Sequence, residues 1–189
     1  MWNEKQIVEY LKINLNSQRF QHSIRVMETA MSLAKFYNVD EKKARLAGLT
    51  HDCAKNLNIM EINDLLEKNG YNIDGMFKNN SNIMHGLVGS IIVKNIMGIL
   101  DEDVLNAIAY HTTGRISMSK LEKIIYLADY IEPMRNFNGV ETLRILAYEN
   151  LNEALLLSFN NTIKYVIDKG ELIHKDTIEA RNYILYTKK

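Results

Sequence analysis

Thr50-His51-Asp52-Cys53-Ala54-Lys55 places an imidazole beside a carboxylate, with a lysine three residues beyond the carboxylate. The preceding residues, from Asp40 to Leu49, have apolar side chains at helical spacing, and Asp40 is a suitable N-cap. The His-Asp pair is therefore expected near a helix C-terminus, where consecutive side chains can reach one point. A metal ion is such a point, because neutral imidazole and carboxylate are both ligands. A His-Asp pair alone is a weak signal, so further ligands must come from elsewhere in the chain.

The composition is that of a folded, helix-rich domain. With 189 residues, of which 47% are apolar and 24% charged, the chain is long enough for one domain with a sizeable core. Its 23 Lys and Arg residues balance its 23 Asp and Glu residues, which gives no electrostatic reason to expect nucleic acid or an anionic membrane as a partner. A single proline, Pro133, favours an all-α fold.

The cysteine content and the apolar segments indicate the compartment. One cysteine, Cys53, excludes an internal disulfide and fits a reducing environment. The N-terminal residues 1–5 lack the apolar stretch of a signal peptide, and the longest nearly charge-free apolar run, Ile83 to Met97, is too short to span a bilayer. We therefore expect a cytoplasmic protein without a membrane partner. Its Met-rich and Ile-rich helices leave the oligomeric state open, with a homodimer as one alternative.

Periodicity and capping residues predict one compact helical bundle spanning residues 1–189. The expected helices cover residues 3–14, 17–37 with Ser17 as the cap, 40–52, 58–69, 82–97, 101–111, a segment from Ser117 or Ser119 to Pro133, 139–169 as one or two helices, and a final helix capped by Asp176. In the eighth segment, apolar residues form a stripe at Leu151, Leu155, Phe159, Ile163 and Val166. The Asn- and Gly-rich residues 71–81 form the one long loop, which could act as a lid.

Side chains from four other expected helices can join the His-Asp pair around a metal, as in helical-bundle enzymes. The candidates are His22, His51-Asp52, His85, His111 and Asp129. Each histidine also has an ordinary explanation: His22 as a hydrogen-bonded core residue, His85 as a helix cap, and His111 as a residue favoured by the helix dipole. Asp129 lies between apolar residues, and a carboxylate is seldom buried without a partner. The fifth histidine, His174, lies in a polar stretch.

The ligand types restrict the metal. Nitrogen and oxygen donors without thiolate disfavour a structural zinc site and suit iron, manganese, cobalt or magnesium, although several histidines make magnesium alone less suitable. Six donors exceed the needs of one catalytic ion, whereas two ions bridged by Asp52 would use them all. Two such ions activate a hydroxide and hold a phosphoryl oxygen, and Lys55 could neutralise a phosphate there.

The chain resembles the YqeK family, the bacterial HD-domain phosphohydrolases that cleave diadenosine tetraphosphate symmetrically. The order His…His-Asp…Asp is the HD signature, and the family's own motifs are matched by Thr50–Lys55, His111–Arg115, Met118–Pro133 with Arg135 beyond it, and Ile173–Asn182. The resemblance implies an all-α HD bundle with iron as the metal. Two positions depart from the family pattern, because Lys175 stands where proline is usual and Ser90 where a small apolar residue is usual.

The resemblance also implies roles for individual residues. The first-metal ligands match His22, His51, Asp52 and Asp129. His85 and His111 match positions that complete a second metal site or contact phosphate. The family's nucleotide-contacting positions match Lys55, Thr112, Arg135, Ile173 and His174, and the nucleotide is expected to reach His85, His111 and Asp129 as well. Asp52 and Lys55 are the expected catalytic residues, Asp52 by orienting the hydroxide and Lys55 by stabilising phosphoryl charge.

Three functions remain as hypotheses at this point. The first is hydrolysis of diadenosine tetraphosphate to two ADP, with the dinucleotide as substrate and ADP as product. The second is an HD enzyme acting on a nucleoside monophosphate, a nucleoside triphosphate or an alarmone, because a metal centre recognises phosphate and not base. The third is a nucleotide-binding protein that has lost catalysis. Such proteins usually lack some of the metal ligands, whereas all six candidates are present in this chain. A nucleic-acid role is disfavoured by the zero net charge.

Overall fold

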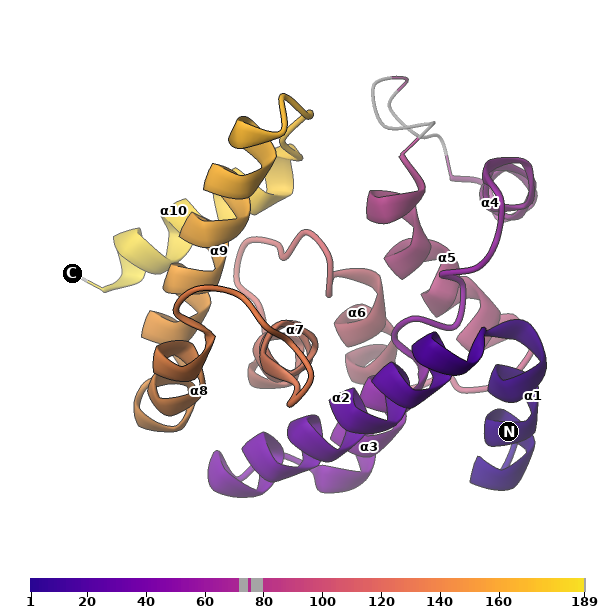
Figure 1. The fold of residues 1–189 in the computed structure, drawn as a ribbon. Helices are drawn as coiled ribbons and strands as arrows, with labels where there is room; N and C mark the ends of the chain where they lie inside the picture. Colours follow the sequence, from indigo (N-terminus) through magenta and orange to yellow (C-terminus); the bar gives the residue numbers. More distant parts are fainter. Residues whose placement is uncertain (72–74, 76–79, 189) are drawn as a thin grey trace.

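The computed structural model describes residues 1–71, 75 and 80–188. Across these residues the backbone forms ten helices and no strand (Figure 1), which confirms the all-α fold class. In chain order the helices are α1 Glu4–Asn14, α2 Ser17–Phe36, α3 Glu41–Thr50, α4 Ile59–Lys68, α5 Ser81–Asn95, α6 Glu102–Ala109, α7 Lys120–Ile131, α8 Val140–Glu149, α9 Leu151–Asp168 and α10 Lys175–Thr187. None of these helices is long and apolar enough to cross a membrane.

Two of the expected helix caps are wrong by one or two residues. Asn16, not Ser17, caps α2, because Asn16 has extended backbone angles and its side chain accepts from the amide of Arg19. His174, not Asp176, caps α10 by accepting from the amide of Asp176 through Nδ1. Asp176 instead lies in the first turn of α10, where its negative charge is favourable to the helix dipole.

The segment 139–169 forms two helices, which meet at Asn150. Asn150 has extended backbone angles, and its side chain caps α9. The predicted apolar stripe of α9 is buried over its first three members, Leu151, Leu155 and Phe159, while Ile163 and Val166 are only partly buried. The C-terminal half of α9 therefore extends beyond the core. Most of the expected loop at 71–81, with its suggested role as a lid, lies outside the described residues.

Helix α7 lies at the centre of the bundle, with α2 and α3 on one side and α8 and α9 on the other (Figure 1). Helix α6 packs against α3, α5 and α7, and α2 packs against α3 and α7, so these five helices surround one buried region. Helices α2 and α3 approach closely at Gly48, where an added Cβ would lie 2.8 Å from the Cα of Met27. A glycine at this position therefore lets α3 come close to α2 at Met27, five residues beyond His22.

Candidate metal centre

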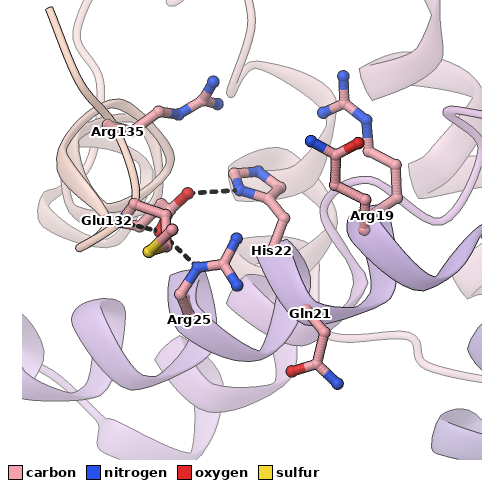
Figure 2. Close-up of a pocket in the computed structure, with 8 residues that line it drawn as sticks. Arg19, Gln21, His22, Arg25, Glu132 and Arg135 are labelled. Atoms are coloured by element: carbon pink, nitrogen blue, oxygen red, sulfur yellow. Dashed lines mark hydrogen bonds and ion pairs between the residues drawn. The ribbon is translucent and has the colours of Figure 1, made fainter.

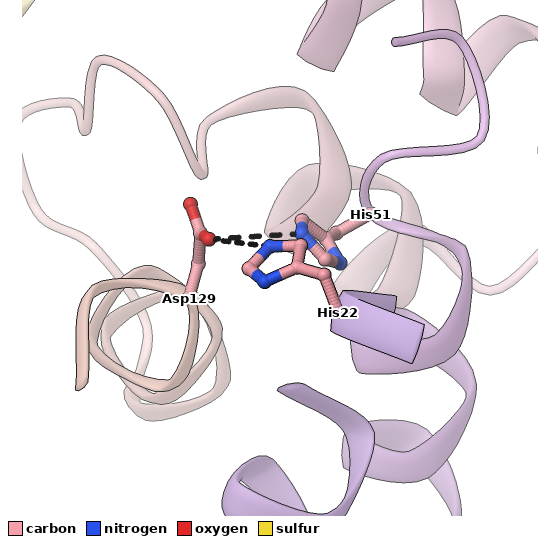
Figure 3. Close-up of side chains that lie close together, drawn as sticks. All are labelled: His22, His51 and Asp129. Atoms are coloured by element: carbon pink, nitrogen blue, oxygen red, sulfur yellow. Dashed lines mark ion pairs between the residues drawn. The ribbon is translucent and has the colours of Figure 1, made fainter. Parts of the chain in front are cut away.

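Three side chains from α2, α3 and α7 meet at one end of this buried region (Figure 3). His22 Nε2 lies 2.9 Å from Asp129 Oδ1, and His51 Nε2 lies 3.9 Å from the same oxygen. One donor atom from each residue lies within 4.8 Å of the other two. Ligand bonds of about 2.1 Å are usual for imidazole and carboxylate, so a single ion can reach all three. Two candidate ligands from the sequence, His22 and Asp129, thus share one site with His51.

Asp52 connects this group to a second one. Its Oδ2 lies 3.8 Å from His22 Nε2 and 3.7 Å from His51 Nε2. Its Oδ1 points the other way, 2.9 Å from His85 Nε2 and 3.7 Å from His111 Nε2. The two oxygens of one carboxylate therefore face two different pairs of histidines. This is the arrangement that a bridging ligand between two ions requires.

Hydrogen bonds at the opposite ring nitrogens fix how the histidines are presented. Each Nδ1 faces a backbone carbonyl or a carboxylate: His22 with Glu132 Oε1 at 3.1 Å, His51 with Gly48 O at 2.8 Å, His85 with Ser81 O at 3.1 Å, and His111 with Ile108 O at 2.6 Å. Such oxygens only accept, so for His51 and His111, whose Nε2 atoms lie 3.7 Å or more from any carboxylate oxygen, these contacts assign the proton to Nδ1 and leave the Nε2 lone pair directed into the cluster. Metal-binding histidines are usually held by outer contacts of this kind.

The buried Nε2 atoms need an electron-poor partner. His51 is fully buried, and its Nε2 has no hydrogen-bond partner. His85 Nε2 and His111 Nε2 lie 3.1 Å apart, so two lone pairs would face each other if both rings are protonated at Nδ1. An unsatisfied buried nitrogen is costly, and a cation between the rings removes the cost. The donor set therefore fits a divalent metal ion.

The ionisation of the cluster suits metal binding. Burial lowers the pKa of His51 to about 4, which keeps its imidazole neutral. Burial alone would raise the pKa of Asp52, but the nearby His51, His111 and His85 hold it well below its usual range. Burial would likewise raise the pKa of Asp129, but its contact with His22 and the nearby His51 and Arg135 lower this pKa below its usual range. These ligands therefore need to release no proton before they bind a metal at neutral pH.

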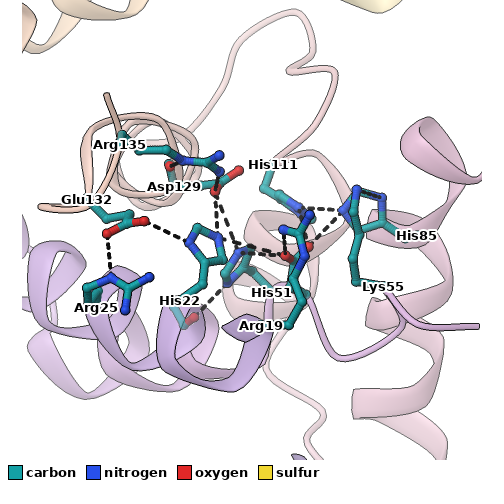
Figure 4. A network of polar contacts seen from close by, with 12 residues as sticks. Arg19, His22, Arg25, His51, Lys55, His85, His111, Asp129, Glu132 and Arg135 are labelled. Carbon is teal, nitrogen blue, oxygen red and sulfur yellow. Dashed lines mark hydrogen bonds and ion pairs between the residues drawn. The ribbon is translucent and has the colours of Figure 1, made fainter. Parts of the chain in front are cut away.

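Three cationic side chains surround the donors (Figure 4). Arg19 Nη1 lies 3.1 Å from Asp52 Oδ2, and Arg135 Nη2 lies 2.5 Å from Asp129 Oδ1. Lys55 Nζ lies 3.4 Å from His85 Nδ1, and its burial lowers its pKa. Guanidinium groups bind phosphate in a bidentate manner, so Arg19 and Arg135 can exchange a carboxylate partner for a phosphoryl group.

Two cavities open onto this cluster. One of about 260 Å³ lies directly over the donors and is lined by Arg19, Asp52, Lys55, Asn82, His85, His111, Thr112, Tyr126, Asp129, Tyr130, Arg135 and Thr162. The other, of about 390 Å³, lies on the α2 side and is lined by Gln18, Arg19, Gln21, His22, Arg25, Glu132, Met134 and Arg135 (Figure 2). Arg19 and Arg135 line both, so both cavities are positively charged next to the metal donors.

The structure gathers most of the predicted site residues around these cavities. His22, the pair His51-Asp52, His85, His111 and Asp129 form the cluster, and Lys55, Thr112 and Arg135 line the cavity above it. Ile173 and His174 precede α10, and their contact with a nucleotide stays a prediction. Ser90 donates to the carbonyl of Leu87 within α5, which lets a hydroxyl occupy a buried position. Lys175 is the first residue of α10.

Sequence reasoning missed three charged residues of the site, Arg19, Arg25 and Glu132. Glu132 is buried, accepts from Arg25 Nε at 2.7 Å and faces His22 Nδ1. A signal was present, because Arg19 and Arg25 each lie three residues from His22 on one helix and Glu132 lies three residues after Asp129. That spacing puts side chains on the same helix face as a candidate ligand.

We expect Glu132→Gln to weaken metal binding by about 10- to 100-fold, the usual cost of losing an outer partner of a metal histidine. The amide cannot carry the charge that now holds His22 and Arg25 together. The metal affinity is measured by titrating metal-free protein with the metal and recording the activity at each concentration. Glu141→Gln, at a side chain that is 78% exposed, is the matched control and should leave the affinity unchanged. Equal affinities for the two variants would contradict the role of Glu132.

Comparisons with known proteins agree over nearly the whole chain. The HD domain family model matches residues 19–134. The chain is 43% identical to the symmetrical bis(5'-nucleosyl)-tetraphosphatase of Halalkalibacterium halodurans, covering 99% of this chain and 100% of the relative, and 37% identical to that of Bacillus subtilis, covering 97% and 98%. A crystal structure of a predicted HD superfamily hydrolase involved in NAD metabolism from Clostridium acetobutylicum superposes with a TM-score of 0.97 at 55% identity, and all of both chains is covered.

Proposed function

Because the chain belongs to the HD domain family, and within it to the symmetrical bis(5'-nucleosyl)-tetraphosphatases, we propose that the histidine clusters around Asp52 carry out the reaction. The enzyme hydrolyses diadenosine tetraphosphate in a metal-dependent reaction, and cleavage at the central bridge yields two ADP. The observation that supports this assignment best is the position of the Asp52 carboxylate, whose two oxygens face two different pairs of histidines. With this carboxylate between two ions, all six candidate donor residues would be metal ligands.

The metal would be held by residues whose donor atoms already converge. His22, His51, Asp52 and Asp129 would hold the first ion, and His85, His111 and Asp52 the second. We propose iron, and the nitrogen and oxygen donors are also compatible with manganese, cobalt or magnesium. When bound, such ions lower the pKa of water and polarise phosphoryl oxygens. We also propose a cytoplasmic location, which a single buried and unpaired cysteine, Cys53, supports.

The side chains around the cluster would bind and orient the tetraphosphate. Arg19 and Arg135 are now paired with Asp52 and Asp129, so ions bound to those carboxylates would leave both guanidinium groups available to phosphate. Lys55 Nζ, beside His85 and Asn82, would contact a phosphoryl oxygen on the opposite side. These three cations would neutralise charge on the phosphates of both halves, including charge that develops on the departing ADP.

Product analysis on metal-quantified protein tests this function. With diadenosine tetraphosphate as substrate, we expect ADP as the sole nucleotide product, because the cationic side chains lie on both sides of the donors. Chromatographic separation of AMP, ADP and ATP after partial turnover gives the answer. AMP and ATP in equal amounts would contradict symmetrical cleavage. Metal-loaded protein that hydrolyses neither this substrate nor mononucleotides would favour the silent nucleotide-binding alternative.

A further inference from the structure

A third cavity, of about 450 Å³, adjoins the cavity over the metal donors. It is lined by Tyr130, Arg135, Phe137, Asn138, Asn161 and Tyr165. Tyr130 and Arg135 line both cavities, so the two are neighbours with a common wall. Apart from Arg135, none of these residues was assigned a role above. The third cavity therefore lies within reach of a ligand at the metal site, although its other four lining residues do not line the cavity over the metal donors.

The lining of this third cavity suits a nucleobase better than a phosphate. Its aromatic rings come from three elements, with Tyr130 on α7, Phe137 on the loop after it and Tyr165 on α9. The rings of Tyr130 and Phe137 pack edge to face, with centroids 5.2 Å apart. Tyr165 is 61% exposed, so a large aromatic side chain stands open to solvent at this site. Aromatic faces of this kind stack on bases.

Two amides and one cation complete the recognition chemistry. Asn138 and Asn161 each offer a donor and an acceptor, which is what the edge of a purine requires. Arg135 is held between the cavities by hydrogen bonds from Nε to the Asp129 carbonyl and from Nη2 to its carboxylate. A base stacked in the third cavity would thus have its phosphates at Arg135 and directed towards the metal donors.

We propose that this cavity binds one of the two adenosines of the dinucleotide substrate. The inference rests on the proposed function, because a substrate with two identical ends and a central scissile bridge needs two nucleoside sites. The resemblance to the family predicts that one nucleotide contacts Ile173 and His174. The third cavity, which shares Arg135 with the metal cavity, takes the other and so holds the central bridge over the donors.

The test compares a ligand with two nucleosides to one with a single nucleoside. KM for diadenosine tetraphosphate and the inhibition constant of adenosine 5'-tetraphosphate are measured in metal-loaded protein. In the unsubstituted enzyme the dinucleotide should bind more tightly, by about the 5- to 100-fold that stacking of one base contributes. Tyr165→Ala should remove most of this advantage and Tyr165→Phe should keep it. Tyr186→Ala, at a 76% exposed tyrosine on α10, is the matched control.

Each outcome decides the proposal. Loss of the dinucleotide advantage in Tyr165→Ala, with its retention in Tyr165→Phe and Tyr186→Ala, supports it, and Asn161→Ala should act in the same direction. An advantage that is absent in the unsubstituted enzyme, or that persists in both Tyr165→Ala and Asn161→Ala, overturns it. These results are read from binding ratios, whereas failure of the proposed function would appear as unsubstituted enzyme that forms no ADP from the dinucleotide.

Discussion

Asp52→Asn is expected to lower kcat for diadenosine tetraphosphate by about 10³-fold or more, which corresponds to about 4 kcal/mol in the barrier. The substitution keeps the size of a side chain that is only 4% exposed, so the packing around it should change little. An amide has one oxygen and no charge, and therefore cannot face both pairs of histidines as a ligand. Loss of the bridge should separate the two ions or remove one of them.

Metal analysis and kinetics together measure this effect. We expect the bound metal to fall from about two ions per chain to one or fewer, in parallel with the loss of activity. Asp64→Asn is the matched control, because Asp64 is 57% exposed on α4 and pairs only with Lys68 among the ion pairs of the described residues. Full activity and full metal content in Asp52→Asn would show that this carboxylate is not a bridging ligand.

The set of candidate ligands was predictable from sequence because it depends on residue types. The chain has only five histidines, and an Asp such as Asp129 among apolar neighbours already implies a buried partner. The structure confirmed that these residues meet, although His22 and Asp129 are far apart along the chain. The helical class followed from periodicity for the same reason, since apolar spacing is a property of the sequence itself.

The orientation of the donors could not be predicted, because it depends on the backbone. His51 and His111 are held by the carbonyls of Gly48 and Ile108, and every residue has a carbonyl, so no sequence signal marks these two. The division of the Asp52 oxygens between two histidine pairs depends on how α3, α5 and α6 pack. The helix caps show a related limit, because Asn16 and Ser17 are both good caps and only the backbone conformation distinguishes them.

Removal of the metal is expected to abolish hydrolysis and to lower Tm by about 5–10 °C. An ion present at about 100 times its Kd stabilises the folded state by about 2.7 kcal/mol, and for a chain of this length each kcal/mol shifts Tm by about 2–4 °C. The physical reason is the donor cluster, where the Nε2 atoms of His22 and His51 are buried without a hydrogen-bond partner. Without a cation, the folded protein carries the cost of these unsatisfied groups.

Thermal melts and assays before chelation, after chelation and after re-addition of ferrous iron or manganese test this expectation. Both stability and activity should return with the metal, and the ion that restores the higher kcat identifies the better fit. Asp52→Asn links the two predictions, because a protein that has already lost the bridge should show a smaller Tm change on chelation. A chelated protein with unchanged activity would contradict the metal dependence of the reaction. An unchanged Tm with lost activity would instead mean that Arg19 and Arg135, through their pairs with Asp52 and Asp129, suffice to stabilise the cluster without an ion.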